Sequence, residues 1–125
     1  MRRALLIIII LAATAAATTP IVKHPGGVVT IDTSTLKASE GCFGPTPLLI
    51  HLDSLECISK IEPLPNAETP AYWQLVVEKL STAWNGVPAD KVKDFKVDAV
   101  SGATYSSEGF ISNVQTGIAY YLELK

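Results

Sequence analysis

DAVSGATYSS, residues 98–107, is the stretch from which the fold of this chain can be worked out. It is small and rich in hydroxyl groups, it carries a single charge at its first residue, and Gly102 lies near its middle. Directly after it, apolar residues recur at the 3.6-residue period of an amphipathic helix, which predicts a helix over 107–123. Ser106 or Ser107 is its expected N-cap. The apolar positions that carry the period are Phe110, Ile111, Val114, Ile118, Tyr121 and Leu122.

A β-hairpin and a second helix are expected upstream of this loop. An apolar strand over 48–52 and a partly alternating strand over 57–64 flank a polar turn, as in a hairpin. Thr69 is a suitable N-cap and Pro70 a suitable first residue for a helix over 70–84. The sequence therefore predicts an α+β fold, in which a small twisted antiparallel sheet carries the two main helices, 70–84 and 107–123.

The N-terminal part of the chain is expected to direct export. A basic start, an apolar run and small residues predict a signal peptide over 1–17, and an uncleaved membrane anchor is the alternative. Residues 18–40 are interpreted as a leader or linker, and 41–125 as the folded domain. Residues 28–31 could form a short strand, but the sequence leaves open whether it joins the main sheet. Either way, the domain is expected outside the cytoplasm.

Composition excludes some classes of function. The chain of 125 residues has a net charge of −2 and no basic patch, which argues against nucleic acid as a partner. His24 and His51 are far apart and have no neighbouring cysteines, so no metal site is expected. Cys42 and Cys57 could form a disulfide in an oxidising compartment, although two small core residues are the favoured interpretation.

The chemistry of residues 98–107 suits a phosphate group, bound or esterified. Gly102 lets a ligand approach the backbone closely, while Ser101 and Thr104 supply hydroxyls. The N–H groups at the start of the next helix lack partners within the helix, and its dipole favours negative charge. On local chemistry alone, an ordinary loop with a capping serine is the favoured alternative.

The order of the residues in this stretch allows a more specific prediction of the ligand. Asp98-x-x-Ser101-Gly102-Ala103-Thr104 resembles the flavinylation motif of the FMN-binding domain family. That family includes covalently flavinylated subunits of sodium-pumping NADH:quinone oxidoreductase and of the Rnf electron-transport complex, as well as small exported flavoproteins. The resemblance implies that FMN is attached to Thr104 through a phosphoester by a separate flavin transferase, which uses FAD and a divalent metal. Asp98, Ser101, Gly102 and Ala103 would form the motif that the transferase reads.

A second resemblance lies about thirty residues upstream. Glu68-Thr69-Pro70 is similar to the Glu-Thr-Pro of the same family, which packs beside the flavin. A weaker similarity begins at residues 41–45, so that the resemblance covers about 41–123. It implies that Glu68 and Thr69 belong to the cofactor site.

The chain also departs from the family pattern. Ala71-Tyr72-Trp73 stands where the family usually has glycines, and Asn66 stands where relatives often have histidine. Two interpretations of the aromatic pair remain open. Tyr72 or Trp73 either stacks on or covers the flavin ring, or both are ordinary core residues of the helix.

The leading hypothesis is an exported electron-transfer flavoprotein with FMN covalently attached to Thr104. It would relay electrons between membrane electron-transport proteins and extracytoplasmic acceptors, as a redox carrier or a subunit of an oxidoreductase system. Thr104 is then an attachment point, and no catalytic residue is predicted. The alternative is a flavin-free exported binding domain of the same fold. A hydrolase that uses His24 or His51 is disfavoured, because neither lies near a hydroxyl motif.

Overall fold

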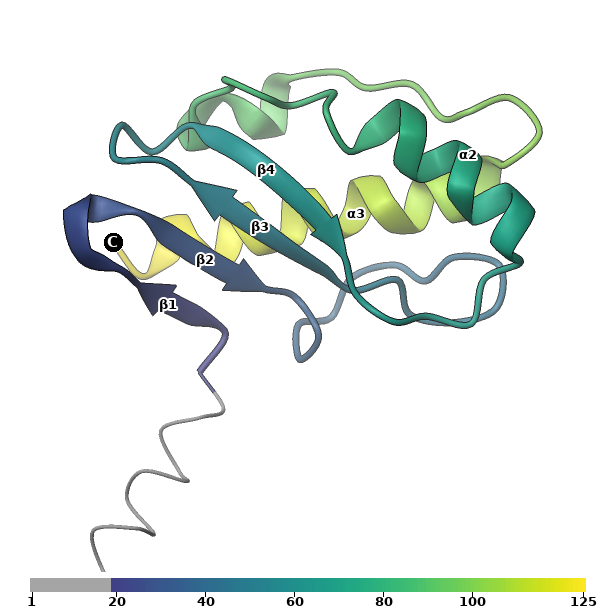
Figure 1. Cartoon of the computed structure of the whole chain (residues 1–125), viewed down its shortest axis with the longest axis horizontal. Helices are drawn as coiled ribbons and strands as arrows, with labels where there is room; N and C mark the ends of the chain where they lie inside the picture. The colour runs from purple at the N-terminus through teal and green to yellow at the C-terminus, as the bar shows by residue number, and fades with distance from the viewer. Residues whose placement is uncertain (1–18) are drawn as a thin grey trace, which may run out of the picture.

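A four-stranded antiparallel sheet forms one layer of the fold, and helix α3 packs across it (Figure 1). The computed structural model describes residues 19–125. Each strand pairs with the next along the chain, in the order β1-β2-β3-β4. The predicted α+β class is therefore confirmed. The strands are β1 (Ile21–Lys23), β2 (Val29–Asp32), β3 (Leu48–Leu52) and β4 (Ile58–Pro63), and the helices are α2 (Pro70–Leu80) and α3 (Thr104–Glu123), with 3-10 turns η1 (Pro25–Gly27) and η2 (Ala89–Asp94).

The predicted hairpin, β3 and β4, forms one half of the sheet, with β4 at the edge. β3 and β4 pair antiparallel, with Ile50 opposite Ile61. The turn between them is held by Asp53, whose Oδ1 accepts hydrogen bonds from the backbone N–H groups of Leu55 at 2.9 Å and Cys57 at 3.0 Å. Such an Asp turn offers the backbone local partners, which is why this sequence reverses direction here.

The sheet also extends upstream of residue 41. β2 pairs with β3 in a register that places Ile31 opposite Ile50, and β1 pairs with β2. Val29 and Ile31 are buried, so β2 contributes to the core. The strand whose place the sequence left open thus joins the main sheet, and part of the segment interpreted as a leader is integral to the fold.

Helix α3 buries the predicted apolar face against the sheet. Phe110, Val114, Ile118 and Tyr121 on this face are buried. Gly117 permits the close approach, because a Cβ there would lie 2.9 Å from Ile50 Cδ1 and from a methyl carbon of the buried Thr33.

Helix α2 packs alongside α3 and is shorter than predicted. It begins at Pro70 as expected but ends at Leu80 rather than at residue 84. Bonds of the i→i+3 type then turn the chain, for example from Asn85 N–H to the Thr82 carbonyl at 3.2 Å. This turn carries Trp84 into the core, where its ring stacks on Phe110 with centroids 6.0 Å apart.

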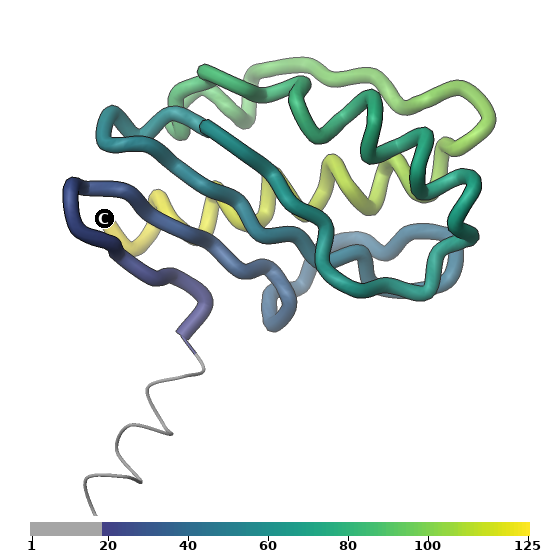
Figure 2. Tube along the Cα trace, viewed as in Figure 1, coloured from purple at the N-terminus to yellow at the C-terminus, as the bar shows by residue number. Residues whose placement is uncertain are grey.

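The segment between α2 and α3 contains little regular structure. It forms the 3-10 turn η2 and is then irregular from residue 95 up to α3. Figure 2 shows this long irregular connection running above α2 before it reaches α3.

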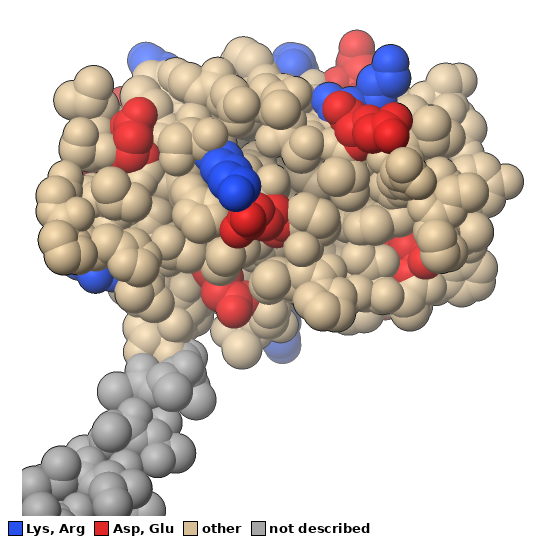
Figure 3. All heavy atoms as spheres, viewed as in Figure 1, with Lys and Arg blue, Asp and Glu red and all other residues tan. Residues whose placement is uncertain are grey.

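The predicted signal peptide, residues 1–17, lies outside the described residues. Among residues 19–125, no helix combines the length and the apolar composition that crossing a bilayer requires. Acidic and basic side chains are scattered over the face of the molecule seen in Figure 3.

Candidate cofactor site

A pocket of about 330 Å³ opens at the N-terminal end of α3. Three segments far apart in the sequence form it: the loop before β3, the first turn of α2 and the first turn of α3. Four of the predicted site residues lie in its wall, because the fold brings the start of α2 beside the start of α3. The lining residues are Cys42, Phe43, Thr69, Tyr72, Gly102, Ala103, Thr104, Tyr105 and Ser106.

Thr104 is the first residue of α3 and is exposed in this pocket. Gly102 turns the chain into the helix with a φ of 84°, a backbone conformation that L side chains rarely adopt. Among residues 19–125, the backbone N–H groups of Thr104, Tyr105 and Ser106 have no hydrogen-bond acceptor. These N–H groups and the positive end of the helix dipole favour an anion here.

Glu68 lies behind the pocket wall and is 6% exposed. Its Oε1 accepts hydrogen bonds from Cys42 N–H at 2.8 Å and Ser106 Oγ at 2.6 Å, and its Oε2 accepts one from Phe43 N–H at 2.6 Å. Burial raises the pKa of Glu68, but the three hydrogen bonds outweigh it and hold the pKa below its usual value. The ionised carboxylate thus joins the loop at residues 42–43 to the first turn of α3.

The two serines expected as N-caps have other roles. Ala103 occupies the N-cap position and offers no side-chain hydrogen bond. Ser106 and Ser107 lie inside the first turn and are buried. Ser107 Oγ donates to the Ala103 carbonyl at 2.7 Å and accepts from Val100 N–H at 2.9 Å, so it fixes the loop before the helix. Thr69 likewise stands at the N-cap of α2 without a side-chain cap bond.

The aromatic pair of α2 divides between the pocket and the core. Tyr72 is 52% exposed and lines the pocket. Trp73 packs partly buried against the core, with its ring centroid 5.9 Å from that of Phe110. The interpretation of both as core residues is therefore wrong for Tyr72 and agrees with the position of Trp73, while contact of Tyr72 with the flavin ring stays a prediction.

The comparisons with known proteins give the ligand class of the domain. The family described as FMN-binding domain matches residues 41–119. This chain belongs to the FMN-binding domain family. The resemblance found in the sequence is thereby confirmed, and the domain is assigned flavin binding in general, with FMN as its cofactor. A comparison with curated proteins returned no match.

The lining of this FMN-binding domain fits the cofactor. An exposed hydroxyl and free N–H groups suit the phosphate end, whereas exposed aromatic side chains suit a flat ring system. None of the nine lining residues is lysine or arginine, so the helix terminus is the positive group at the wall. No cluster of three or more potential metal ligands occurs among residues 19–125.

The remaining predicted site residues lie beside this pocket. Asp98 and Ser101 line a neighbouring open groove of about 580 Å³, together with Leu75 and Lys79 of α2. The motif is thus divided, with its first half on this groove and Gly102 to Thr104 in the pocket.

Several residues that support this pocket were not predicted as site residues from the sequence. Gly41 has no room for a side chain, because a Cβ would collide with the Glu68 carboxylate. A Cβ on Gly109 would lie 2.6 Å from Thr46 Oγ1 and 2.8 Å from Gly41 N. These glycines let the loop pack directly on α3, and Ser106 completes the link to Glu68. The sequence did contain one signal of this close packing: Gly109 follows Ser106 by three residues and so lies on the same face of the helix.

The two cysteines are not placed as the sequence predicted, and the two histidines lie outside the pocket. Both cysteines are free, Cys42 exposed in the pocket wall and Cys57 half-buried, so neither a disulfide nor a pair of core residues is present. His24 Nε2 lies 2.8 Å from Thr30 Oγ1, and His51 Nε2 lies 2.9 Å from Glu62 Oε2. Neither histidine lines the pocket at Thr104.

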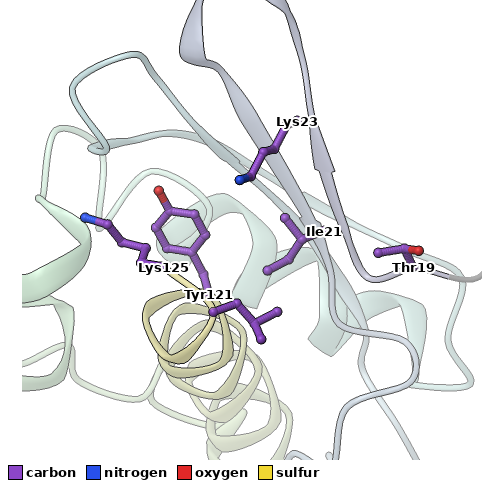
Figure 4. A pocket seen from close by; sticks show the side chains of 6 residues that line it. Thr19, Ile21, Lys23, Tyr121 and Lys125 are labelled. Carbon is purple, nitrogen blue, oxygen red and sulfur yellow. The ribbon is translucent and has the colours of Figure 1, made fainter.

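A larger pocket, of about 530 Å³, lies at the opposite end of α3 (Figure 4). Lys23 and Ile21 of β1 and Tyr121 and Lys125 of the C-terminal end form its walls. It contains none of the motif residues, and its Lys125 is paired with Glu56 at 2.7 Å. The pocket at Thr104, which contains the motif residues Gly102 to Thr104, is therefore the candidate cofactor site.

Proposed function

We propose that this protein is an exported electron-transfer flavoprotein whose FMN is attached by a phosphoester to Thr104. The observation that carries the proposal is the position of Thr104: its side chain is exposed at the start of α3, in the pocket that Thr69 lines and Glu68 supports. An acceptor hydroxyl must be reachable by a modifying enzyme, and the two serine hydroxyls of this turn, on Ser106 and Ser107, are buried.

The residues of the pocket hold the cofactor and orient it. The ester phosphate retains one negative charge, which the free N–H groups of the first turn of α3 stabilise. When bound, FMN supplies hydride and single-electron chemistry, so the chain needs no general base of its own. Covalent attachment suits a protein outside the cell membrane, where flavin that dissociates is lost.

The modification is made by a separate flavin transferase. Thr104 Oγ accepts the FMN moiety of FAD, the pyrophosphate bond of FAD breaks, AMP leaves and the hydroxyl proton is released. Asp98 and Ser101, on the groove beside α2, are part of the motif that the transferase reads. Membrane electron-transport proteins are the proposed electron donors, and extracytoplasmic carriers the proposed acceptors. The export signal is residues 1–17.

The test is to co-express the full chain with a flavin transferase and look for flavin fluorescence on a denaturing gel. We expect a fluorescent band for the wild type and for Thr104→Ser, and none for Thr104→Ala. Thr82→Ala, which removes an exposed hydroxyl outside the pocket, is the matched control and should stay fluorescent. A wild-type band without fluorescence would overturn the proposal in favour of a flavin-free binding domain. Fluorescence that separates from the protein on denaturation would overturn the attachment alone.

A further inference from the structure

Exposed aromatic side chains gather at the pocket of Thr104. Four phenylalanine or tyrosine residues among 19–125 are exposed, and three of them line this pocket: Phe43 at 62%, Tyr72 at 52% and Tyr105 at 68% exposure. Single exposed apolar residues are ordinary on protein surfaces, but a cluster in one concave site indicates a ligand or partner. The three come from three separate segments, so no single helix face explains the cluster.

The backbone at two of these aromatic residues is fixed by neighbouring contacts. Trp73, next to Tyr72, packs against Phe110, and Pro70 begins the same turn of helix. This anchoring fixes where the Tyr72 side chain leaves α2. The backbone of Phe43 is fixed in turn, because its N–H donates to Glu68. A rigid aromatic side chain loses little conformational entropy when a flat ligand stacks on it.

From this arrangement we propose that Tyr72 stacks on the isoalloxazine ring of the attached flavin and shields it from solvent, with Phe43 as a second apolar contact. The inference rests on the proposed function, because it places the flavin at Thr104. Flat aromatic systems prefer offset stacking on tyrosine and phenylalanine rings. The pocket walls carry no lysine or arginine that would instead bind the ring through charge. A protein partner that docks on these aromatics is the competing occupant.

Flavin emission reports the contact, because a phenol stacked on the ring quenches flavin fluorescence by electron transfer. In the flavinylated full chain we expect weak emission that rises several-fold when the protein is denatured. Tyr72→Ala should raise the emission of the native protein towards the denatured level. It should also raise the iodide quenching constant of the flavin towards that of free FMN.

Two further variants distinguish the loss of ring stacking at Tyr72 from a general loss of structure. Tyr72→Phe keeps a stacking ring but lacks the phenol, so emission should rise while protection from iodide persists. Phe95→Ala removes an exposed aromatic residue outside the pocket and should match the wild type in both readouts. Thermal unfolding of each variant confirms that the fold is retained.

The proposal is overturned if Tyr72→Ala changes neither emission nor iodide access, which is the result expected when a protein partner is the true occupant. It is also overturned if Tyr72→Phe loses protection as fully as Tyr72→Ala. If the wild type carries no covalent flavin, FMN is titrated into the purified chain and the same variants are compared. Failure of attachment to Thr104 and failure of ring contact at Tyr72 are therefore separate results.

Discussion

Replacing Glu68 with glutamine tests how the cofactor pocket is held together. The substitution keeps the size of the side chain but removes its charge and turns one acceptor oxygen into an N–H₂ group. Glu68 now accepts from Cys42 N–H, Phe43 N–H and Ser106 Oγ, and both of its oxygens are used. Whichever way the amide is oriented, at least one of these donors faces another donor.

The loss of stability caused by Glu68→Gln can be estimated from the hydrogen bonds that it changes. A hydrogen bond to a charged group contributes roughly 1.5–3 kcal/mol, and a buried donor left unpaired costs about 1–3 kcal/mol. Because the remaining bonds survive in a weaker neutral form, we expect the free energy of unfolding to fall by about 2–4 kcal/mol. Against a total of about 5–15 kcal/mol, this is a large fraction. It corresponds to a fall in melting temperature of roughly 10–20 °C.

The assay is denaturant unfolding followed by tryptophan fluorescence, since Trp84 is fully buried and reports loss of the core. Glu108→Gln, the same chemical change at an exposed position of α3, should shift stability by less than about 0.5 kcal/mol. If Glu68→Gln unfolds at the same denaturant concentration as Glu108→Gln, the carboxylate does not hold the pocket wall and the reasoning is refuted.

The same carboxylate gives a pH dependence with a definite sign. The pKa of Glu68 is lower in the folded chain than its ordinary value of 4.5, so the folded state favours the ionised form. Its contribution to stability is fully present above pH 4.5 and is lost as the pH falls through the folded pKa. The stability difference between wild type and Glu68→Gln should therefore shrink in acid.

Three further predictions concern the core. Phe110→Ala should cost about 3–5 kcal/mol, because its fully buried ring contacts both Trp73 and Trp84, and equilibrium unfolding measures the loss. Gly109→Ala should cost about 1–3 kcal/mol by overpacking against Thr46 and Gly41; an unchanged melting temperature would contradict the close approach. Burial and the hydrogen bond to Glu56 raise the pKa of Tyr121 to about 12, so its stabilising effect should disappear as the pH rises from 10 towards 12, as ultraviolet titration can follow.

Much of the fold was predictable because its signals are local. The period of Phe110, Val114 and Ile118 identified α3, and Pro70 identified the start of α2. The end of α2 was missed, because burying Trp84 on Phe110 outweighs the continuing helical pattern. Whether β2 joins the sheet depends on a partner strand about twenty residues away, which no local pattern specifies.

The sequence predicted several residues of the candidate site but not the contacts and hydrogen bonds between them. Resemblance singled out Thr104 and Glu68-Thr69-Pro70, and the structure places Thr69 and Thr104 in one pocket wall. The bond from Ser106 to Glu68 joins residues 38 positions apart, so Ser106 was interpreted as a local cap instead. Tyr72 and Trp73 are neighbours in sequence, and only packing decides which one faces the pocket.

The central claim, that Thr104 carries FMN, is tested most directly by mass spectrometry of the chain co-expressed with a flavin transferase. We expect one peptide to gain the mass of FMN less one water, and fragmentation to place the addition on Thr104. Thr104→Ser should keep the addition and Thr104→Ala should lose it. An addition on another residue, or an unmodified wild-type chain under conditions that flavinylate a known acceptor domain, would contradict the account.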